Sequence, residues 1–452
     1  MSSRPSRILS APGAFMEVAV EGTAPMAARI QPALFAGLCL LLFSAPLAMG
    51  AVFPWSVLAL EAGAAALLIL WIARELCAAR VRVTWNPLFG PALLFAAVIA
   101  AQFAFHTSAV PALTRYEALK YVAYALLMFT AVQAVRSDDQ YRRFAAVAIV
   151  FGLGVALFAI VQDFTWNGML YWMFRPSFPS RPFGPYVNHN HFAGLMELLA
   201  PLPLALAVAL KSLTPGKRAL LAFAAILMAG SVALSGSRGG MLAVGAEILL
   251  LGGYVAGRRA LRPAAVLAVA CVLMGAFLWW IGSEQILARF SADQGPTLSM
   301  QTRLRITRSA VRMARERPVL GWGLGTFSTV YPPFRDFYGD RFINQAHDDY
   351  AQFLAETGAV GFAAVLWFVG TLLACGARRS HGADEFIGSA VKLGLLLGCA
   401  GVLVHSFADF NLQIPANAAL FYVFAALAAS PEASAHALIR HIPLRHSYRN
   451  MR

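Results

Sequence analysis

The sequence predicts an all-α protein that spans a membrane about twelve times and carries one long helical loop outside the membrane. Of its 452 residues, 59% are hydrophobic and only 13% are charged, and the mean hydropathy is +0.64. Soluble domains carry about 25% charged residues, so a soluble core does not explain this composition. A membrane span needs roughly 20 apolar residues, and the chain contains about a dozen such runs.

The expected spans are apolar runs separated by charged or turn-forming residues. They lie at residues 33–52, 55–74, 88–105, 117–135, 144–163, 191–210, 219–236, 239–256, 264–282, 357–376, 388–408 and 415–430. The first two are so close, at Pro54 and Trp55, that they could form a re-entrant pair. Residues 1–30 lack the charged-then-apolar pattern of a cleavable signal peptide, so the first run is expected to be a retained span.

Basic residues in the short loops predict the orientation of the spans, because such loops are enriched in lysine and arginine on the cytoplasmic side. The loops and the tail on that side contain Arg74, Arg80, Arg82, Arg136, Arg142, Arg143, Lys211, Lys217, Arg218, Arg258, Arg259, Arg262, Arg378, Arg379, Arg440, Arg445, Arg449 and Arg452. We therefore expect the N-terminal segment 1–32 and the basic tail 431–452 to be cytoplasmic. Spans one to nine then occupy 33–282, and spans ten to twelve occupy 357–430.

Three loops fall on the opposite side, at 164–190, 235–239 and 283–356. The last is too long for a simple connection and holds nine arginines from Arg289 to Arg341. Long loops cross membranes largely regardless of their charge, so the orientation stands. The positive charge of this loop still requires an explanation.

The stretch TRLRITRSAVRMARERPVLGWG at 302–323 predicts an amphipathic helix that ends before Pro318. At about 100° per residue, four arginines share one stripe, and this pattern fits a helix lying on a membrane surface. The stripe contains Arg305, Arg308, Arg312 and Arg315, and the opposite face contains Leu304, Ile306, Ala310, Val311, Met313 and Ala314. Arg303 projects into the apolar face instead. It therefore needs an anionic partner, either a carboxylate or a phosphate held by the guanidinium.

A second arginine lies where two spans meet, in LSGSRGGML at 234–242. The small residues around Arg238 allow a large group to approach the backbone. Arg238 could extend toward lipid headgroups, but an arginine at the membrane edge is also a candidate functional residue.

Two further stretches place histidines at external span ends. RPFGPYVNHNHFAGLMELL at 181–199 contains Asn188, His189, Asn190 and His191. HSFADFNLQIPANAALF at 405–421 contains His405 and Asp409 about one helical turn apart, and Asn411 and Asn417 follow. Two histidines at i and i+2 are too few ligands for a catalytic zinc site. We expect these residues either to cap and pack helix ends or to contact a substrate.

The stretch INQAHDDYAQFLAETGAVG at 343–361 sets His347 beside two acids at the start of a span. A neutral imidazole near a carboxylate is a plausible general base near pH 7, and Asp348, Asp349 or Glu356 could orient it. The alternative is a polar helix start, in which the acids favour the helix dipole.

Taken together, the external side would carry two arginines that can hold a diphosphate and one histidine that can deprotonate a hydroxyl. The sequence contains no P-loop, no GxGxxG motif after a strand, no GxSxG motif and no metal-ligand cluster. The five cysteines lie in or beside apolar runs without metal-ligand spacing and are expected to be core residues. This combination predicts transfer from a membrane-held diphosphate lipid to a hydroxyl. No cofactor is expected.

Five of these stretches, in this order, resemble the O-antigen ligase and Wzy-type polymerase superfamily (the Wzy_C family). They are GPYVNHNHFAG at 184–194, SGSRGG at 235–240, TRLRITRSAVRMARERPVLGWGLGTF at 302–327, HDDYAQFLAETGAVG at 347–361 and HSFADFNLQIPANA at 405–418. The resemblance implies a glycosyltransferase with a GT-C-like fold in the bacterial inner membrane and an active site facing the periplasm. It implies an undecaprenyl-diphosphate-linked glycan donor, a metal-independent inverting reaction, contact with membrane lipids and no nucleic-acid partner.

The resemblance also implies roles for individual residues. Arg238 and Arg303 match the family's diphosphate-binding arginines, with Arg305 as an alternative match two positions away, and His347 matches its catalytic histidine. Two positions depart from the usual pattern: Thr307 stands where many relatives have tryptophan, and His189 stands where many have arginine. These departures affect the expected donor or acceptor specificity and leave the enzyme class unchanged.

Several functions remain open from the sequence. A ligase would transfer the glycan to lipid A–core, whereas a polymerase would transfer it to another lipid-linked repeat unit. A transporter or flippase should carry charged groups along a pathway within the spans, and Glu61, Glu197 and Glu247 are too few for a convincing relay. A structural scaffold would explain neither Arg303 nor His347.

Overall fold

The computed structural model describes residues 24–78, 81, 83–176, 182–258, 261–291, 298–338 and 342–431, and the regular structure within these ranges is helical, with no strand. The prediction of an all-α protein is therefore confirmed. The elements are α1 (Ala24–Ser44), η1 (Ala45–Leu47), α2 (Pro54–Cys77), α3 (Phe89–Ala104), α4 (Pro111–Ala134), α5 (Asp138–Phe164), α6 (His189–Leu199), α7 (Pro201–Ala209), α8 (Pro215–Ser235), α9 (Arg238–Arg258), α10 (Leu261–Ser291), α11 (Met300–Glu316), α12 (Phe327–Val330), η2 (Pro332–Phe334), α13 (Asp349–Arg379), α14 (Ile387–His405), η3 (Asn411–Gln413) and α15 (Pro415–Ala429).

Each predicted span overlaps a helix, and the protein is a multi-pass membrane protein. In the part of the chain that the structure describes, eight helical stretches are long and apolar enough to cross a membrane. Helices α3 and α15 are apolar but shorter, at 16 and 15 residues. Helix α4 has 24 residues, and its first turns carry Arg115, Glu117 and Lys120. The number of crossings therefore stays a prediction.

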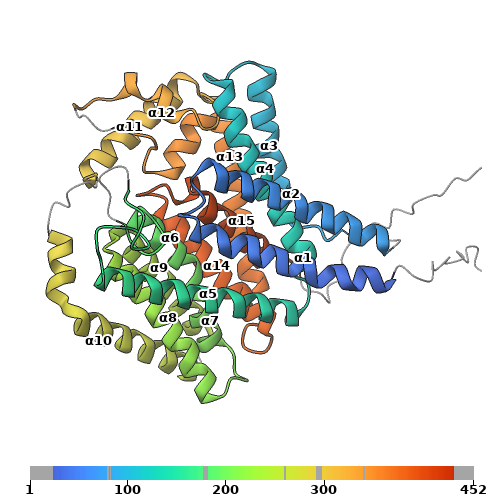
Figure 1. The fold of residues 1–452 in the computed structure, drawn as a ribbon, viewed down its shortest axis with the longest axis vertical. Helices are drawn as coiled ribbons and strands as arrows, with labels where there is room; N and C mark the ends of the chain where they lie inside the picture. Colours follow the sequence, from blue (N-terminus) through green and yellow to red (C-terminus); the bar gives the residue numbers. More distant parts are fainter. Residues whose placement is uncertain are drawn as a thin grey trace, which may run out of the picture.

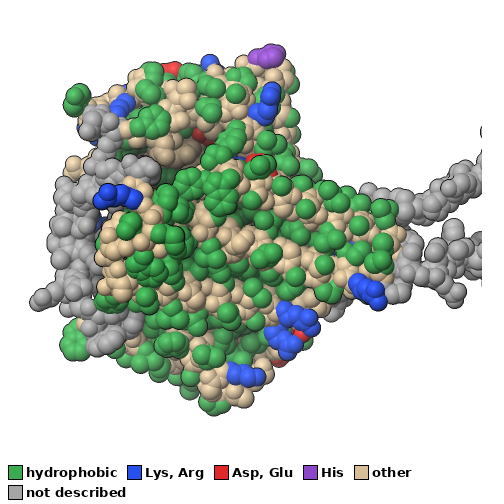
Figure 2. Space-filling model, in the orientation of Figure 1, with side chains coloured by type: hydrophobic (Ala, Val, Ile, Leu, Met, Phe, Trp, Pro, Cys, Tyr) green, Lys and Arg blue, Asp and Glu red, His purple; other side chains and the backbone are tan. Residues whose placement is uncertain are grey.

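The centre of the bundle is formed by α6, α7, α14 and α15, whose side chains are nearly all buried. The other helices surround them, and the predicted span at 191–210 is divided into α6 and α7 at Pro201 (Figure 1). Proline supplies no backbone N–H and fits the first turn of a helix. In a space-filling view, apolar side chains cover most of the visible middle of the molecule, while lysines and arginines lie toward its rims (Figure 2).

Helix ends predicted to lie on one side of the membrane meet in the structure. Lys211 Nζ lies 2.6 Å from Asp384 Oδ2, and Arg258 Nη1 lies 3.1 Å from Asp384 Oδ1. The Asn86 amide donates to the Ala426 carbonyl at 2.8 Å. These contacts join helix ends expected to be cytoplasmic, far in sequence from the residues of the candidate site.

The long external loop is folded, and its amphipathic helix does not have the expected free apolar face. In α11, Ile306, Ala310 and Met313 are buried in a cluster that includes Phe327 and Ala351. The Trp322 indole also donates to the Met313 carbonyl at 2.8 Å. The expectation that this face lies on a membrane is wrong, because the residues that follow α11 cover it.

The expected composition of the apolar face of α11 also needs correction, because Leu304 is half exposed. The arginine stripe largely faces outward: Arg308, Arg312 and Arg315 are exposed. Arg305 differs, because its Nε donates to Asp336 Oδ1 at 3.1 Å and its guanidinium covers the Phe337 ring.

Helix α13 begins earlier than the predicted span and has a break at Gly358, where φ is +63°. A Cβ at this position would lie 2.4 Å from the Val319 carbonyl oxygen, so glycine alone fits the close approach and the left-handed φ. The break separates a first segment, which carries Asp349 and Glu356, from the apolar segment that matches the predicted span.

Candidate active site

Polar residues from four distant stretches of the chain meet around the buried carboxylate of Asp409. Asp409 lies between α14 and α15, and its Oδ1 accepts the Phe410 backbone N–H at 2.9 Å. Its Oδ2 accepts hydrogen bonds from the Asn190 amide and from Arg303 Nη1, the latter at 3.2 Å. The buried carboxylate is thus satisfied by three donors, as a buried charge requires.

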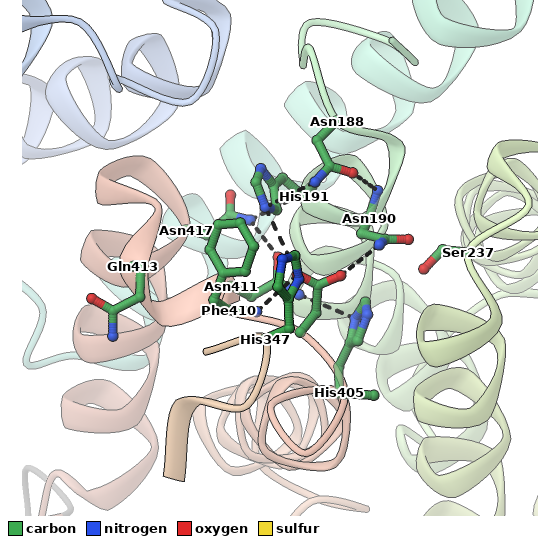
Figure 3. Close-up of polar contacts among 12 residues, drawn as sticks. Asn188, Asn190, His191, Ser237, His347, His405, Phe410, Asn411, Gln413 and Asn417 are labelled. Carbon is green, nitrogen blue, oxygen red and sulfur yellow. Dashed lines mark hydrogen bonds and ion pairs between the residues drawn. The ribbon is translucent and has the colours of Figure 1, made fainter. Parts of the chain in front are cut away.

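Two histidines that pack against the same aromatic ring also lie near this carboxylate. His347 Nδ1 lies 3.8 Å and His191 Nε2 lies 4.0 Å from Asp409 Oδ1. Both imidazoles pack edge-on against Phe410, with ring centroids 4.7 and 4.8 Å apart (Figure 3). These distances exceed a hydrogen bond, but they place both rings within electrostatic reach of the carboxylate.

The backbone at His347 is held in an unusual conformation. Its φ is +53°, a left-handed value that costs a non-glycine residue of order 1–3 kcal/mol. The turn is fixed on its N-terminal side by a hydrogen bond from the Ala346 N–H to the Gln352 side chain at 2.9 Å. On its C-terminal side, Asp348 caps α13. The strain therefore accompanies a geometry that directs the imidazole to Asp409.

The electrostatic surroundings keep His347 neutral at pH 7. The pKa of His347 is lowered to about 4, mainly by burial and to a lesser extent by the nearby Arg303, while Asp409 opposes the shift. Burial raises the pKa of Asp409, but Arg303 and the neighbouring histidines outweigh it and bring the pKa below its ordinary value. The site thus pairs an ionised carboxylate with a neutral imidazole, whose Nε2 can accept a proton if Nδ1 carries the hydrogen.

The three acids expected to orient His347 have other partners, so that expectation is wrong. Asp348 accepts the Ala351 N–H at 3.0 Å as the N-cap of α13. Asp349 accepts from the Ser406 hydroxyl at 2.8 Å and the Leu412 N–H at 3.2 Å. Asp348 thus caps its own helix, and Asp349 joins the start of α13 to the segment after α14.

Glu356, like Asp348 and Asp349, accepts hydrogen bonds that hold the fold together. Its carboxylate accepts the backbone N–H groups of Gly325 and Phe327 at 2.9 and 3.0 Å. It therefore fastens the segment after α11 to α13.

The candidate arginines have different surroundings. Arg303 is largely buried and donates through Nη1 to the Ala408 carbonyl and to Asp409. Arg305 pairs with Asp336 at the partly exposed outer surface. Arg238 is the exposed first residue of α9, in the turn that follows Gly236. The structure thus places Arg303 beside His347 and Arg305 on another face of α11.

Arg238 joins the site through its neighbours on α9. A Cβ at Gly239 would lie 2.5 Å from His405 Nε2, and one at Gly240 would lie 2.9 Å from Glu197 Oε1. The absence of side chains at both positions allows α9 to approach α6 and α14. The turn carrying Arg238 therefore contacts the same group of helix ends.

A second polar layer lies next to Asp409. His405 Nδ1 lies 2.8 Å from Glu197 Oε1, and the Asn411 amide lies 3.1 Å from the same nitrogen. The Asn417 amide donates to the His191 carbonyl at 2.8 Å. These contacts join α6, α14 and α15 beneath the two histidines that face Asp409.

The start of α6 matches the helix-cap interpretation. Asn188 is its N-cap and accepts the Asn190 N–H at 3.0 Å. His189 is the buried first residue of the helix. Within the described part of the chain, no group of three or more His, Cys, Asp or Glu side chains could hold a metal ion.

Sequence reasoning missed the partner of His347. Asp409 and Asn190 were expected only as helix-end or substrate-contacting residues, and Phe410 was not expected in the site. The position of Arg303 on the apolar face of α11 could have identified Asp409. A guanidinium on such a face needs an anionic partner, and Asp409 is an acid in a predicted external turn.

The family model of O-antigen ligase (Wzy_C) matches residues 223–366. Arg238, Arg303 and His347 lie inside this range, whereas Asp409 and His191 lie outside it. Among curated proteins, none matches the chain. This match confirms the predicted resemblance and supports a ligase- or polymerase-type membrane enzyme of polysaccharide biosynthesis.

Proposed function

We propose that this chain is an O-antigen ligase-type glycosyltransferase, which moves a glycan from undecaprenyl diphosphate to a hydroxyl group of an acceptor. The observation that carries the proposal is the neutral His347, which faces the ionised Asp409 with Arg303 alongside. The family match to residues 223–366 supports the donor class. The enzyme would lie in the bacterial inner membrane, with its site facing the periplasm.

In the proposed reaction, the acceptor hydroxyl attacks the anomeric carbon of the lipid-linked sugar. His347 takes the hydroxyl proton as the new C–O bond forms and the bond from the sugar to the diphosphate breaks. The undecaprenyl diphosphate leaves with the bonding electron pair. A single displacement of this kind inverts the anomeric centre.

Arg303 and Arg238 are proposed to stabilise the negative charge that develops on the leaving diphosphate. Both contacts of Arg303 to the Asp409 turn use Nη1, so its Nε and Nη2 hydrogens can bind a phosphate. Two guanidinium groups can supply the charge neutralisation that a divalent cation supplies in other phosphate chemistry. The proposed reaction is therefore metal-independent.

Asp409 is proposed to stabilise the imidazolium that forms when His347 accepts the proton. The carboxylate is ionised and buried, so its attraction for a positive charge at 3.8 Å is only weakly screened. The separation of 3.8 Å between His347 Nδ1 and Asp409 Oδ1 exceeds a hydrogen bond and can shorten to one when the reactants bind. Asn188, His189, His191 and His405 are proposed to contact or position the donor or acceptor.

The first test is glycan transfer by the purified protein in detergent, with an undecaprenyl-diphosphate oligosaccharide as donor. One reaction contains lipid A–core and the other contains no added acceptor. Product on lipid A–core supports a ligase, whereas a ladder of longer lipid-linked chains without acceptor indicates a Wzy-type polymerase.

The same reactions are run with two histidine variants. His347→Ala is expected to abolish transfer. His381→Ala changes an exposed histidine near the opposite helix ends and is expected to leave transfer unchanged. Full activity of His347→Ala would remove His347 from the chemistry.

A further inference from the structure

His405, the last residue of α14, is bonded through its backbone to the turn that holds Arg303. Its carbonyl accepts the N–H groups of Ala408 and Asp409 at 2.8 and 3.1 Å. The Ala408 carbonyl and the Asp409 carboxylate are in turn the two acceptors of Arg303 Nη1. The position of His405 therefore sets the position of the acceptors that fix Arg303.

The imidazole of His405 lies against a second part of the site, the turn that carries Arg238. A Cβ at Gly239 would meet the Cδ2 and Nε2 atoms of the ring, the latter at 2.5 Å. The close approach is possible only because position 239 has no side chain. The edge of the His405 ring thus determines how near the first turn of α9, which begins at Arg238, lies to the end of α14.

Glu197 on α6 holds that ring in one orientation. Its Oε1 lies 2.8 Å from His405 Nδ1, and the Asn411 amide lies 3.1 Å from the same nitrogen (Figure 3). His405 is 1% exposed and Glu197 is fully buried, so neither side chain is open to a substrate. A buried polar network of this kind rigidifies the groups around it, and here those groups are the two turns of the site.

We propose that His405 and Glu197 are positioning residues that fix the spacing of Arg238 and Arg303 and thereby make the site selective for a diphosphate over a monophosphate. This inference rests on the proposed function, in which both arginines bind the diphosphate. Arg303 is fixed through the Asp409 turn, and one guanidinium can hold one phosphate. The second phosphate is held only if Arg238 lies at the matching distance, and the His405 ring sets that distance.

The test compares the binding of undecaprenyl diphosphate and undecaprenyl monophosphate to the full-length protein in detergent. One charge-assisted contact more should give the wild type a preference for the diphosphate of roughly tenfold or more. Glu197→Ala removes the partner of His405 Nδ1 and should abolish most of this preference, while the Kd for the monophosphate stays nearly unchanged. Glu197→Gln keeps an oxygen that can accept from Nδ1 and should retain the preference.

Substitution of Gly239 tests the edge of the ring directly. Gly239→Ala places a methyl group against His405 and should reduce the preference as Glu197→Ala does. His405→Asn removes the ring atoms that this methyl group meets, so the double variant should be no weaker than His405→Asn alone. Gly245→Ala is the matched control, because it lies on the same helix with no atom within 4 Å of the added Cβ, and it should behave as the wild type.

The outcomes separate this inference from the proposed function. If Arg238→Ala loses the preference but Glu197→Ala and Gly239→Ala keep it, the positioning role is refuted and the proposed function stands. If Arg238→Ala keeps the preference, Arg238 does not bind the diphosphate, and that part of the proposed function fails together with the inference.

A role in packing alone would give a different result, because general loosening of the helices would weaken both lipids alike. Equal loss of both affinities in Glu197→Ala would therefore overturn the inference. If Glu197→Ala does not fold, as judged by its Tm, the comparison of Gly239→Ala with the double variant decides: additive losses refute the contact between the ring and the turn, and suppression supports it.

Discussion

Replacement of Asp409 by asparagine removes one charge at the candidate site and exchanges one carboxylate oxygen for an amide nitrogen, which cannot accept a hydrogen bond. Asparagine keeps the size of the side chain and can still accept the Phe410 N–H through its oxygen. It removes the negative charge that lies 3.8 Å from His347 Nδ1 and 3.2 Å from Arg303 Nη1. The neutral ground state of His347 gains little from this charge, whereas the imidazolium formed during transfer gains much.

The expected magnitude follows from the distance. With an effective dielectric constant of about 20, two unit charges at 3.8 Å attract by about 4 kcal/mol. Arg303 cancels part of this attraction, so the expected loss of kcat is about 100- to 1000-fold at 1.36 kcal/mol per tenfold change. The KM for the acceptor is expected to change less, because the charge acts mainly on the transition state.

The assay is a double-mutant cycle of glycan transfer with Asp409→Asn, His347→Ala and the double variant. If Asp409 acts through His347, the double variant is no slower than His347→Ala alone. Additive losses would refute this reasoning and assign Asp409 to the positioning of Arg303. Unchanged kcat in Asp409→Asn would exclude both roles.

Four further predictions concern His347, the arginines of α11 and the break in α13. Burial lowers the pKa of His347 to about 4; kcat/KM should stay constant as pH falls through 6.5 and decline only near 4, and a decline centred at 6.5 would contradict the buried geometry. The neutral imidazole likewise contributes stability above the unfolded pKa of about 6.5, which is lost as pH falls toward 4 and is measurable as a falling Tm. Arg303→Ala should reduce transfer at least 100-fold, whereas Arg305→Ala should reduce it less than tenfold, because that arginine pairs with an exposed aspartate; equal losses would indicate that both bind the donor. Gly358→Ala should lower the Tm in detergent, because alanine resists φ +63° and its Cβ would meet a backbone carbonyl, while Gly370→Ala, with no atom within 4 Å, should not; equal Tm values would show that the break is not required.

The fold was largely predictable because membrane spans leave a strong local signal. A run of apolar residues must be helical in lipid to satisfy its backbone, and every predicted span overlaps a helix. The division of one span at Pro201 and the early start of α13 at Asp349 were less predictable. The first is a break within a continuous apolar run, and the second places the break of α13 at Gly358 inside a helix instead of at its start.

The candidate site was predictable in its residues but not in its pairings. Arg303 was identified by its position on an apolar face, and the structure gives it the expected anionic partner in Asp409. The acids next to His347 in sequence were expected to orient it, but Asp348 accepts from the start of α13 and Asp349 accepts from Ser406, after α14. The observed partner is 62 residues away, and this pairing depends on how α13 and α14 pack.

The burial of the apolar face of α11 explains how Arg303 and His347 come to face the same carboxylate of Asp409. An uncovered amphipathic helix would rest on lipid and could slide along the membrane surface, so Arg303 would have no fixed position. Ile306, Ala310 and Met313 are instead buried against the segment that leads into His347 and α13. This packing holds Arg303 against the Asp409 turn and fixes the arginine relative to the imidazole. The apolar face of α11 therefore contributes to the proposed chemistry indirectly, because its burial sets the distance between the group that would bind the diphosphate and the group that would take the proton.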